Sequence, residues 1–397
     1  MGSGGLMNRF DREWRLFVNG SFVESTGSAV LPVHNPATGA AFTETPDSTA
    51  TDIDRAVAAA DEAAEDLAAM TPRGRGDLLH DLANVIKSHA EELAHLVVAE
   101  NGKPIRQARS DVESAVERVR YYVGGTDKFL GDAVLDSTEE VQKKIFEPLG
   151  VVGIVIPWNW SLVNSVDFAA IAIAAGNAAV VKPAPETPLS ALRAAELLGN
   201  RLPDGALNVV TGRDETGKAL VEHPDVDKVA FVGNDETGER ILRSLADTVT
   251  PAMMELGGKN AAVVFPNVDV SRAADGVIYS SFKNNGEDCS GSERLLVHED
   301  IYDEFVTIIR KRVESVTVGE GTDEGCQIGP LISQAHRDHV AEKVERALDQ
   351  GASVLVQADL PYEPGLQDGF WFPRRCWATL SATTTLCTRR CSGRCWP

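Results

Sequence analysis

Short apolar runs alternate with amphipathic stretches through the middle of the chain. Apolar runs bounded by turn residues are typical of parallel strands that are buried on both faces. These runs occupy residues 151–156, 178–181, 207–210, 229–232 and 261–264. Apolar positions three and four apart predict helices between them, at residues 189–198, 217–221 and 236–245. The alternation predicts a doubly wound parallel α/β sheet, whose ligands bind at the carboxyl ends of the strands.

Longer amphipathic stretches predict helices on both sides of this region. Ser48 or Thr49 can N-cap a helix whose apolar face contains positions 53, 57, 60, 64 and 67. Further helices are predicted at residues 75–98, 105–129, 270–284 and 301–316. Residues 136–148 are predicted to be extended. We expect a second α/β unit to begin near residue 255, after the strands of the first unit.

The chain is acidic and lacks the sequence features of a membrane or secreted protein. Its 397 residues are enough for two or three domains. It contains 59 Asp and Glu against 38 Lys and Arg, which disfavours nucleic acid as a partner because the phosphate backbone is also negative. No apolar run reaches the roughly 20 residues that cross a bilayer, and the first residues do not begin a secretory signal. We expect a cytoplasmic protein with no nucleic-acid or membrane partner.

The excess of acidic residues predicts adaptation to high salt. A dispersed net charge of −21 repels itself at low ionic strength and is screened by added ions. The alternative is an ordinary acidic cytosolic protein. We expect the midpoint temperature of unfolding to rise from low salt to molar KCl. Thermal unfolding over a KCl series measures this, and a midpoint that does not change would contradict the salt-adaptation hypothesis.

Cys289 has the surroundings of a reactive thiol. A lone cysteine usually behaves as a small buried apolar residue. Cys289 instead ends the polar, turn-prone run Asn-Asn-Gly-Glu-Asp-Cys, which is poor packing material. A thiolate can attack a carbonyl carbon, and a carboxylate can activate the water that releases the acyl group. Glu255, which lies just before Gly257 and Gly258, is a candidate for that base. Cys326 lacks such a setting, and we interpret it as structural.

Polar residues and glycines also follow two of the predicted strands. Asn159 comes after Pro-Trp at the end of the strand at 151–156, and its side-chain amide can donate to an oxyanion. Gly233, Asn234 and Gly238 lie in a turn that follows the strand at 229–232 and opens a helix. The N-terminus of a helix binds phosphates, although no Gly-Lys-Ser/Thr makes this turn a Walker loop. The alternative for each position is an ordinary turn residue.

The order of these motifs, from about residue 17 to about residue 372, resembles the aldehyde dehydrogenase superfamily. Gly286, Glu287 and Arg294 around Cys289 match its pattern as well. The resemblance implies a Rossmann-like dinucleotide-binding domain at 8–129 and 149–256, an oligomerisation hairpin at 130–148 and a partial catalytic domain at 257–373. It also implies a homo-oligomer, either a dimer or a tetramer, and a small-molecule aldehyde as the substrate.

The same resemblance implies the chemistry. Cys289 would attack the aldehyde, giving a thiohemiacetal and then, after hydride transfer to NAD or NADP, a thioester. Asn159 and the backbone N–H of Cys289 would hold the oxyanion, and Glu255 would activate water for hydrolysis. The product is a carboxylic acid. The motifs do not identify the aldehyde.

A set of residues is implied to bind the cofactor: Trp158, Lys182, Pro185, Glu186, Gly233, Asn234 and Gly238. By resemblance, Lys182 would reach the adenosine ribose. Members that prefer NAD often carry Glu where this chain has Pro185, and Glu186 is one residue later. We therefore expect NAD or NADP, with NADP tolerated unless Glu186 takes the place of the missing carboxylate.

The composition changes after Phe372. Residues 374–397 contain five Arg, no Asp or Glu, and four of the six cysteines. The family pattern would continue instead with an acidic strand and loop and a Glu-x-Phe-Gly-Pro element. We interpret residues 374–397 as an out-of-frame tail, with a genuine tail as the alternative. The alternative to an active enzyme is then an inactive truncated relative with at most residual dinucleotide binding. The clustered cysteines do not form two CxxC-like pairs, so no metal site is predicted.

Overall fold

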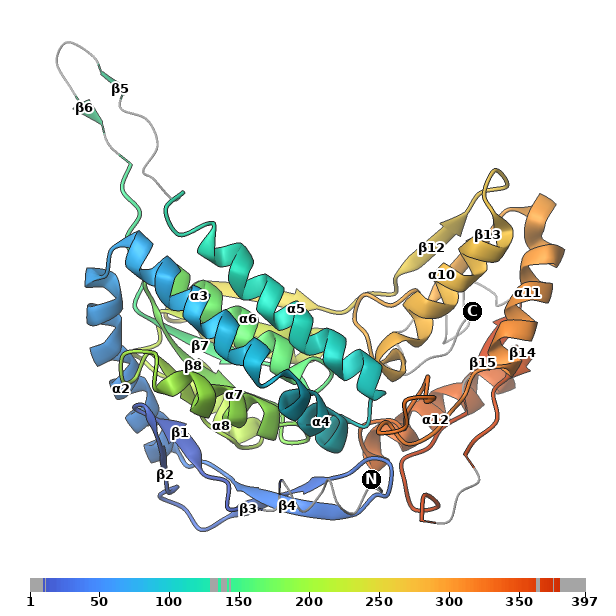
Figure 1. Ribbon diagram of the computed structural model, residues 1–397, viewed down its shortest axis with the longest axis horizontal. Helices are drawn as coiled ribbons and strands as arrows, with labels where there is room; N and C mark the ends of the chain where they lie inside the picture. The colour runs from blue at the N-terminus through green and yellow to red at the C-terminus, as the bar shows by residue number, and fades with distance from the viewer. Residues whose placement is uncertain are drawn as a thin grey trace.

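Two α/β units make up the described part of the chain, and each has its own hydrophobic core. The computed structural model describes residues 10, 12–128, 135–136, 141–142, 144–361, 365–373 and 375–378. In Figure 1 the larger unit lies on the left and the smaller one on the right. The core of the larger unit surrounds its sheet, with Ile154 and Val180 fully buried. Phe305 and Val344 belong to the core of the smaller unit.

The larger unit contains a seven-stranded sheet in the order β11-β10-β7-β8-β9-β1-β2. Its five parallel strands are β7 (Val151–Val155), β8 (Ala178–Lys182), β9 (Leu207–Val209), β10 (Lys228–Gly233) and β11 (Ala252–Leu256). The predicted doubly wound sheet is therefore confirmed. Two antiparallel strands, β1 (Leu16–Val18) and β2 (Ser21–Val23), extend one edge. The sequence pattern did not predict them because three residues are too few to show alternation.

The connections place helices on both faces of the sheet. Helices α6 (Ser161–Ala174) and α7 (Leu189–Gly199) lead from β7 to β8 and from β8 to β9. Helices α8 (Asp214–Val221) and α9 (Asp235–Ala246) lead to β10 and β11 on the other side of β7. Because parallel crossovers are right-handed, these two pairs of helices cover opposite faces. The strand order reverses between β7 and β10, and this is the point at which ligands bind to such sheets.

Four helices precede the parallel strands and pack beside them. They are α2 (Ala50–Ala69), α3 (Pro72–Ser88), α4 (Ala90–Asn101) and α5 (Ile105–Val123). The hydroxyl of Thr49 accepts from Asp52 N at 3.3 Å, so Thr49 is the predicted N-cap of α2. The prediction of one helix at 75–98 is wrong. The Ser88 hydroxyl donates to Val85 O at 2.8 Å and His89 Nδ1 lies 2.9 Å from the same oxygen, which ends α3. Helix α5 also ends earlier than predicted, at Gly124.

The smaller unit is built from two short sheets and the helices between them. Strand β12 (Ala261–Val264) pairs with β13 (Arg294–Val297), and β14 (Ser353–Gln357) pairs with β15 (Arg375–Ala378). The apolar run at 261–264 is therefore a strand of this second unit, which the sequence predicted to begin near residue 255, and it does not pair with the main sheet. The helices are α10 (Val270–Phe282), η1 (Lys283–Gly286), η2 (Glu299–Ile301), α11 (Tyr302–Glu314) and α12 (Gln334–Asp349).

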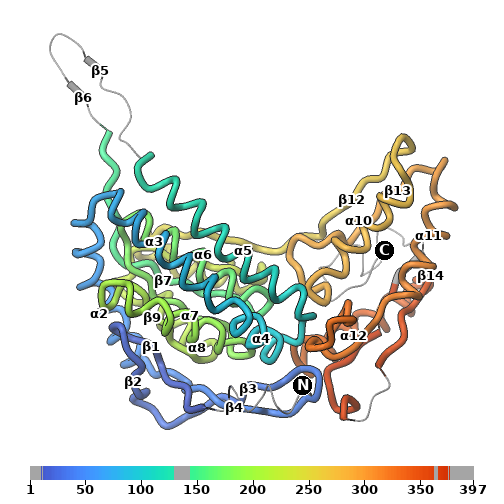
Figure 2. The backbone as a smooth tube through the Cα atoms, in the orientation of Figure 1, coloured from blue at the N-terminus to red at the C-terminus, as the bar shows by residue number. Residues whose placement is uncertain are grey.

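Two hairpins complete the described chain. Strands β3 (Val30–His34) and β4 (Ala41–Pro46) run along the lower edge of the larger unit in Figure 2 and extend towards the smaller unit. Their turn contacts the smaller unit, since Phe370 N donates to Pro36 O at 2.9 Å. Strands β5 (Leu135–Asp136) and β6 (Val141–Gln142) pair within the predicted oligomerisation hairpin. The rest of residues 129–143 and, in the predicted tail, residues 374 and 379–397 lie outside the described residues.

None of the helices in the described part of the chain combines the length and the apolar character that a bilayer-spanning segment requires.

Candidate active site

A cavity of about 150 Å³ lies at the point where the strand order of the main sheet reverses. Loops after β7, β10 and β11 form one side of it, and the loop that carries Cys289 forms the other. The lining residues are Pro157, Trp158, Asn159, Val232, Gly233, Asn234, Glu255, Leu256, Glu287, Asp288, Cys289 and Glu293. The fold thus brings together all three predicted catalytic residues and three of the predicted cofactor residues. Lys182, Pro185, Glu186 and Gly238 do not line the cavity.

The Cys289 loop, residues 283–289, has an unusual backbone. Asn284 and Asn285 have φ values of 54° and 53°, a left-handed conformation that Asn tolerates better than most residues with a side chain. The side chain of Asn285 holds this turn in place. Its Nδ2 donates to Pro330 O at 2.9 Å, and its Oδ1 accepts from Gly329 N at 2.6 Å. The smaller unit therefore fixes the loop before any substrate arrives.

Two further polar contacts hold the backbone near the thiol. The buried carboxylate of Glu287 accepts from Ile332 N at 3.0 Å and lies 3.6 Å from His336 Nε2. Asn260 Nδ2 donates to Cys289 O at 2.6 Å. Asn260 lies directly before β12, so the chain that leaves Glu255 returns to bind the residue that carries the thiol.

Asn159 connects the end of β7 to the Cys289 loop. Its Nδ2 donates to Glu287 O at 2.9 Å. An amide nitrogen has two N–H groups, so one remains for an oxyanion in the cavity. The backbone oxygen of Asn159 accepts from Lys103 Nζ and from Asn284 Nδ2, each at 2.9 Å. Neighbouring elements therefore hold both the side chain and the backbone oxygen of Asn159.

The acidic side chains of the cavity differ in their partners. Glu293 forms an ion pair with Lys259 at 2.7 Å, and Asp288 lies 4.0 Å from Lys283 Nζ. Glu255, at the end of the edge strand β11, is exposed, and its side chain forms no hydrogen bond or ion pair with any residue that the structure describes. A carboxylate without a protein partner is free to accept a proton from water, which is the role that the sequence predicts for Glu255.

The N-terminus of α9 lies next to the cavity and has the form of a phosphate site. Asn234 is its N-cap, because the side-chain oxygen accepts from Thr237 N at 2.8 Å. The amide nitrogen of Asn234 is left as a donor. Gly238 allows α9 to approach β11, since a Cβ at this position would lie 2.9 Å from Leu256 Cδ2. These residues fit a dinucleotide, whose pyrophosphate binds at the N-terminus of a helix.

Lys182 ends β8 with a side chain that is 5% exposed. Burial lowers the pKa of its ammonium, while the carboxylates of Glu186, Asp214 and Asp47 act in the opposite direction. Burial raises the pKa of Glu186, and the charge of Lys182 opposes this shift. Glu186 therefore interacts with Lys182 even though it is one residue later than the family pattern. Glu186 is therefore a candidate for the carboxylate that Pro185 cannot supply.

Cys326 differs from Cys289 in its burial and in its place in the fold. It is 1% exposed, does not line the cavity, and hydrogen-bonds through Sγ to Gly319 O and Ile328 O. Burial raises the pKa of its thiol to about 11. In the described part of the chain, no group of three or more His, Cys, Asp or Glu side chains is arranged to hold a metal ion. The side chains of the tail cysteines lie outside that part: Cys376, Cys387, Cys391 and Cys395.

Sequence reasoning missed several residues that shape the cavity. Asn260 and Asn285 were visible only as polar residues beside the named motifs, and no spacing rule links them to their partners. Lys103 was missed because a lysine between two helices is normally solvated. Its burial depends on elements that are far away in the sequence.

The sequence model of the Aldehyde dehydrogenase family matches residues 22–384. This chain belongs to the aldehyde dehydrogenase family. It is 35% identical over 356 residues to the putative aldehyde dehydrogenase DhaS of Bacillus subtilis (strain 168), covering 88% of this chain and 72% of that protein. It is 38% identical over 352 residues to the phenylacetaldehyde dehydrogenase of Pseudomonas fluorescens, covering 86% and 70% of the two chains.

Solved structures of aldehyde dehydrogenases have the same fold. The NAD⁺ complex of the enzyme from Bacillus cereus superposes with a TM-score of 0.93 at 34% identity, covering 98% of this chain and 79% of that one. As a member of this family, the protein is an oxidoreductase that acts on aldehydes.

Proposed function

We propose that this aldehyde dehydrogenase oxidises an aldehyde to a carboxylic acid through a thioester on Cys289, with NAD⁺ or NADP⁺ as the hydride acceptor. One observation carries the proposal. A thiol, an amide with an unused N–H and a carboxylate without a protein partner line one cavity at the topological switch point of a dinucleotide-binding sheet.

The first half of the reaction uses Cys289 and Asn159. The thiolate of Cys289 adds to the carbonyl carbon, and the electron pair of the C=O bond moves to the oxygen. The unused N–H of Asn159 and the backbone N–H of Cys289 donate to that oxyanion. Bound NAD⁺ or NADP⁺ would supply the acceptor for the hydride that leaves the former aldehyde carbon. The oxyanion then collapses to a thioester on Cys289.

The second half uses Glu255. Its carboxylate takes a proton from water, and the resulting hydroxide attacks the thioester carbon. The C–S bond breaks, the sulfur leaves as the thiolate, and the carboxylic acid is released. Because Glu255 is exposed, the proton passes from it to solvent. The balance is one aldehyde, one water and one oxidised cofactor converted to one acid, one reduced cofactor and one proton.

The residues around α9 and Lys182 would hold the cofactor. The N-terminus of α9 would take the pyrophosphate and Lys182 the adenosine ribose. The related Bacillus cereus enzyme was solved with NAD⁺, which supports a dinucleotide as the cofactor. We also propose that the protein works in the cytoplasm as a homo-oligomer, with the β5–β6 pair in the contact between subunits.

Aldehyde oxidation is tested by incubating the protein with a panel of aliphatic, aromatic and charged aldehydes and either cofactor. The proposal expects one carboxylic acid for each reduced cofactor with at least one aldehyde. If no aldehyde reduces either cofactor while the protein still binds NAD⁺, the inactive-relative alternative is favoured instead.

Cofactor choice provides a separate prediction. The carboxylates of Glu186, Asp214 and Asp47 act electrostatically on Lys182, and we expect them to repel a 2′-phosphate bound near it. We expect kcat/KM for NAD⁺ to exceed that for NADP⁺ by at least about tenfold, which is roughly 1.4 kcal/mol of transition-state discrimination. From Pro185 alone we expected NADP⁺ to be tolerated, and the acids around Lys182 change that expectation. Glu186→Gln should lower the ratio of kcat/KM for NAD⁺ to kcat/KM for NADP⁺ severalfold. Initial rates over a concentration series of each cofactor measure this ratio.

The matched control is Glu239→Gln, which removes one charge from the exposed face of α9, where Glu239 pairs with Arg243. It should leave the ratio of the two kcat/KM values unchanged. Equal use of NAD⁺ and NADP⁺ by the unmodified protein would show that Glu186 does not exclude the phosphate.

A further inference from the structure

Lys103 is a charged side chain with 1% exposure and is among the largest fully buried side chains in the described part of the chain. It lies in the short turn between α4 and α5, directly after Gly102, which has φ 81°. Burying an ammonium group is costly unless charge partners and hydrogen bonds replace its water. The partners of Lys103 therefore indicate why a lysine is kept there.

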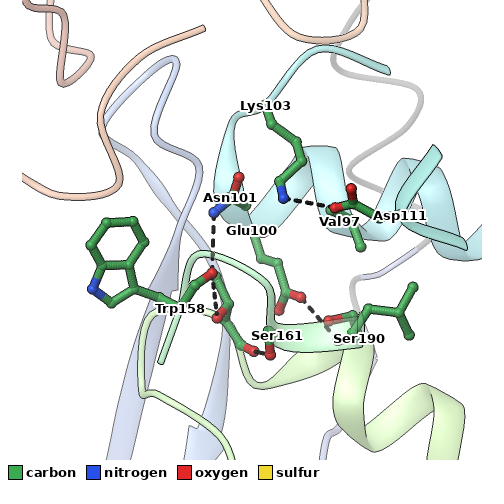
Figure 3. Close-up of a pocket in the computed structure, with 10 residues that line it drawn as sticks. Val97, Glu100, Asn101, Lys103, Asp111, Trp158, Ser161 and Ser190 are labelled. Atoms are coloured by element: carbon green, nitrogen blue, oxygen red, sulfur yellow. Dashed lines mark hydrogen bonds and ion pairs between the residues drawn. The ribbon is translucent and has the colours of Figure 1, made fainter. Parts of the chain in front are cut away.

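Three groups surround the ammonium. Its Nζ lies 2.7 Å from Asp111 Oδ2 on α5 and donates to Asn159 O at 2.9 Å. The ring of Trp160 lies 4.4 Å from the same nitrogen, within cation–π range. Figure 3 shows the Lys103 side chain directed at Asp111. One of the partners is a charge on the neighbouring helix, and the other two belong to the loop that follows β7.

The loop after β7, residues 157–160, is held mainly by its backbone oxygens. Trp158 O accepts from Asn101 Nδ2 at 3.2 Å and from the Thr187 hydroxyl at 3.3 Å. The first of these contacts is visible in Figure 3, beside a cavity of about 10 Å³. Of the side chains that donate to these backbone oxygens, Lys103 is the charged one. It binds the backbone oxygen of Asn159, whose side chain reaches the Cys289 loop.

We propose that Lys103 is a positioning residue for the oxyanion donor Asn159, an inference that rests on the function proposed above. Asp111 holds the ammonium, the ammonium holds the Asn159 backbone, and the side-chain amide is thereby aimed into the cavity. Misplacing such a donor by about 1 Å can cost on the order of 100-fold in rate. The loss would fall on the chemical step more than on aldehyde binding, because the donor acts on charge that develops during the reaction.

The experiment compares two variants of the full chain. Lys103→Met with Asp111→Leu removes the donor together with the carboxylate that pairs with it. Asp111→Asn keeps the donor to Asn159 O and changes only its holder. Positioning predicts that the double variant forms reduced cofactor in the first turnover about 10- to 100-fold more slowly, with KM for the aldehyde within about threefold. Because Asp111 holds the ammonium, the Asp111→Asn variant should slow the same first turnover, but by less than the double variant does. Thermal unfolding and NAD⁺ binding check that both are folded.

A background of Asn159→Ala separates positioning from a purely structural role. If Lys103 acts through Asn159, adding the double variant to Asn159→Ala should slow the first turnover by less than about twofold more. The same fold loss in both backgrounds would overturn the proposal. If the double variant keeps the unmodified first-turnover rate while Asn159→Ala is slow, only the role of Lys103 is overturned. Full speed for Asn159→Ala would overturn the oxyanion assignment on which both proposals rest.

Discussion

Cys289→Ala should lower aldehyde-dependent reduction of NAD⁺ or NADP⁺ by at least about 10⁴-fold, because no thioester can form without the thiol. The substituted side chain is small and half-buried, so the cavity and the cofactor site should remain intact. Steady-state assays with the best aldehyde measure the loss. Binding of NAD⁺ to the variant, followed by fluorescence, should be within about threefold of normal and shows that the protein is folded.

Cys326→Ala is the control for this change. It also removes one thiol, but that thiol is buried away from the cavity with a pKa raised to about 11. Activity should remain within a factor of about two, because burial makes this sulfur a packing group. Comparable losses from the two substitutions would mean that Cys289 is not the nucleophile.

Glu255→Gln should separate the two halves of the reaction. Hydride transfer does not need a base at this position, so the first equivalent of reduced cofactor should still form rapidly. Hydrolysis of the thioester should slow by about 100-fold or more, the usual contribution of a general base. Stopped-flow absorbance should show a burst close to one equivalent per active site, followed by slow turnover. Loss of the burst, or unchanged turnover, would remove Glu255 from this role.

Glu293→Gln is the matched control for Glu255→Gln, since both carboxylates line the same cavity. Glu293 is already paired with Lys259 at 2.7 Å and is poorly placed to accept a proton from water. The substitution should not produce a burst followed by slow turnover. A burst in Glu293→Gln and none in Glu255→Gln would mean that Glu293, and not Glu255, is the general base.

The main sheet was predictable because its strands are short apolar runs with clear ends. The parts of the fold that were predicted wrongly or missed have local causes. The break at His89 depends on two side chains that bind one carbonyl, while apolar spacing continues through it. The run at 261–264 looks like the other strands, but its partner is β13, which a run of apolar residues alone does not specify. Strands β1 and β2 are too short to detect.

The candidate site was predictable where its residues follow strands. Asn159, Gly233 and Glu255 come at or after the carboxyl ends of β7, β10 and β11, and parallel pairing brings those ends together. Contacts that hold these residues were not predictable. Lys103 and Asn285 each bind backbone oxygens from distant parts of the chain, and hydrogen bonds to a backbone leave no trace in side-chain patterns.

The close approach of Gly238 to Leu256 affects how natural variants of this protein should be interpreted. A glycine in a phosphate-binding turn is usually assumed to matter for the dinucleotide alone. Here a side chain at position 238 would push on Leu256, the neighbour of Glu255 on β11. An enzyme with such a substitution is expected to lose cofactor affinity, and any displacement of β11 that accompanies the substitution would slow hydrolysis of the thioester as well. A defect in hydrolysis therefore does not by itself locate a mutation near the thioester.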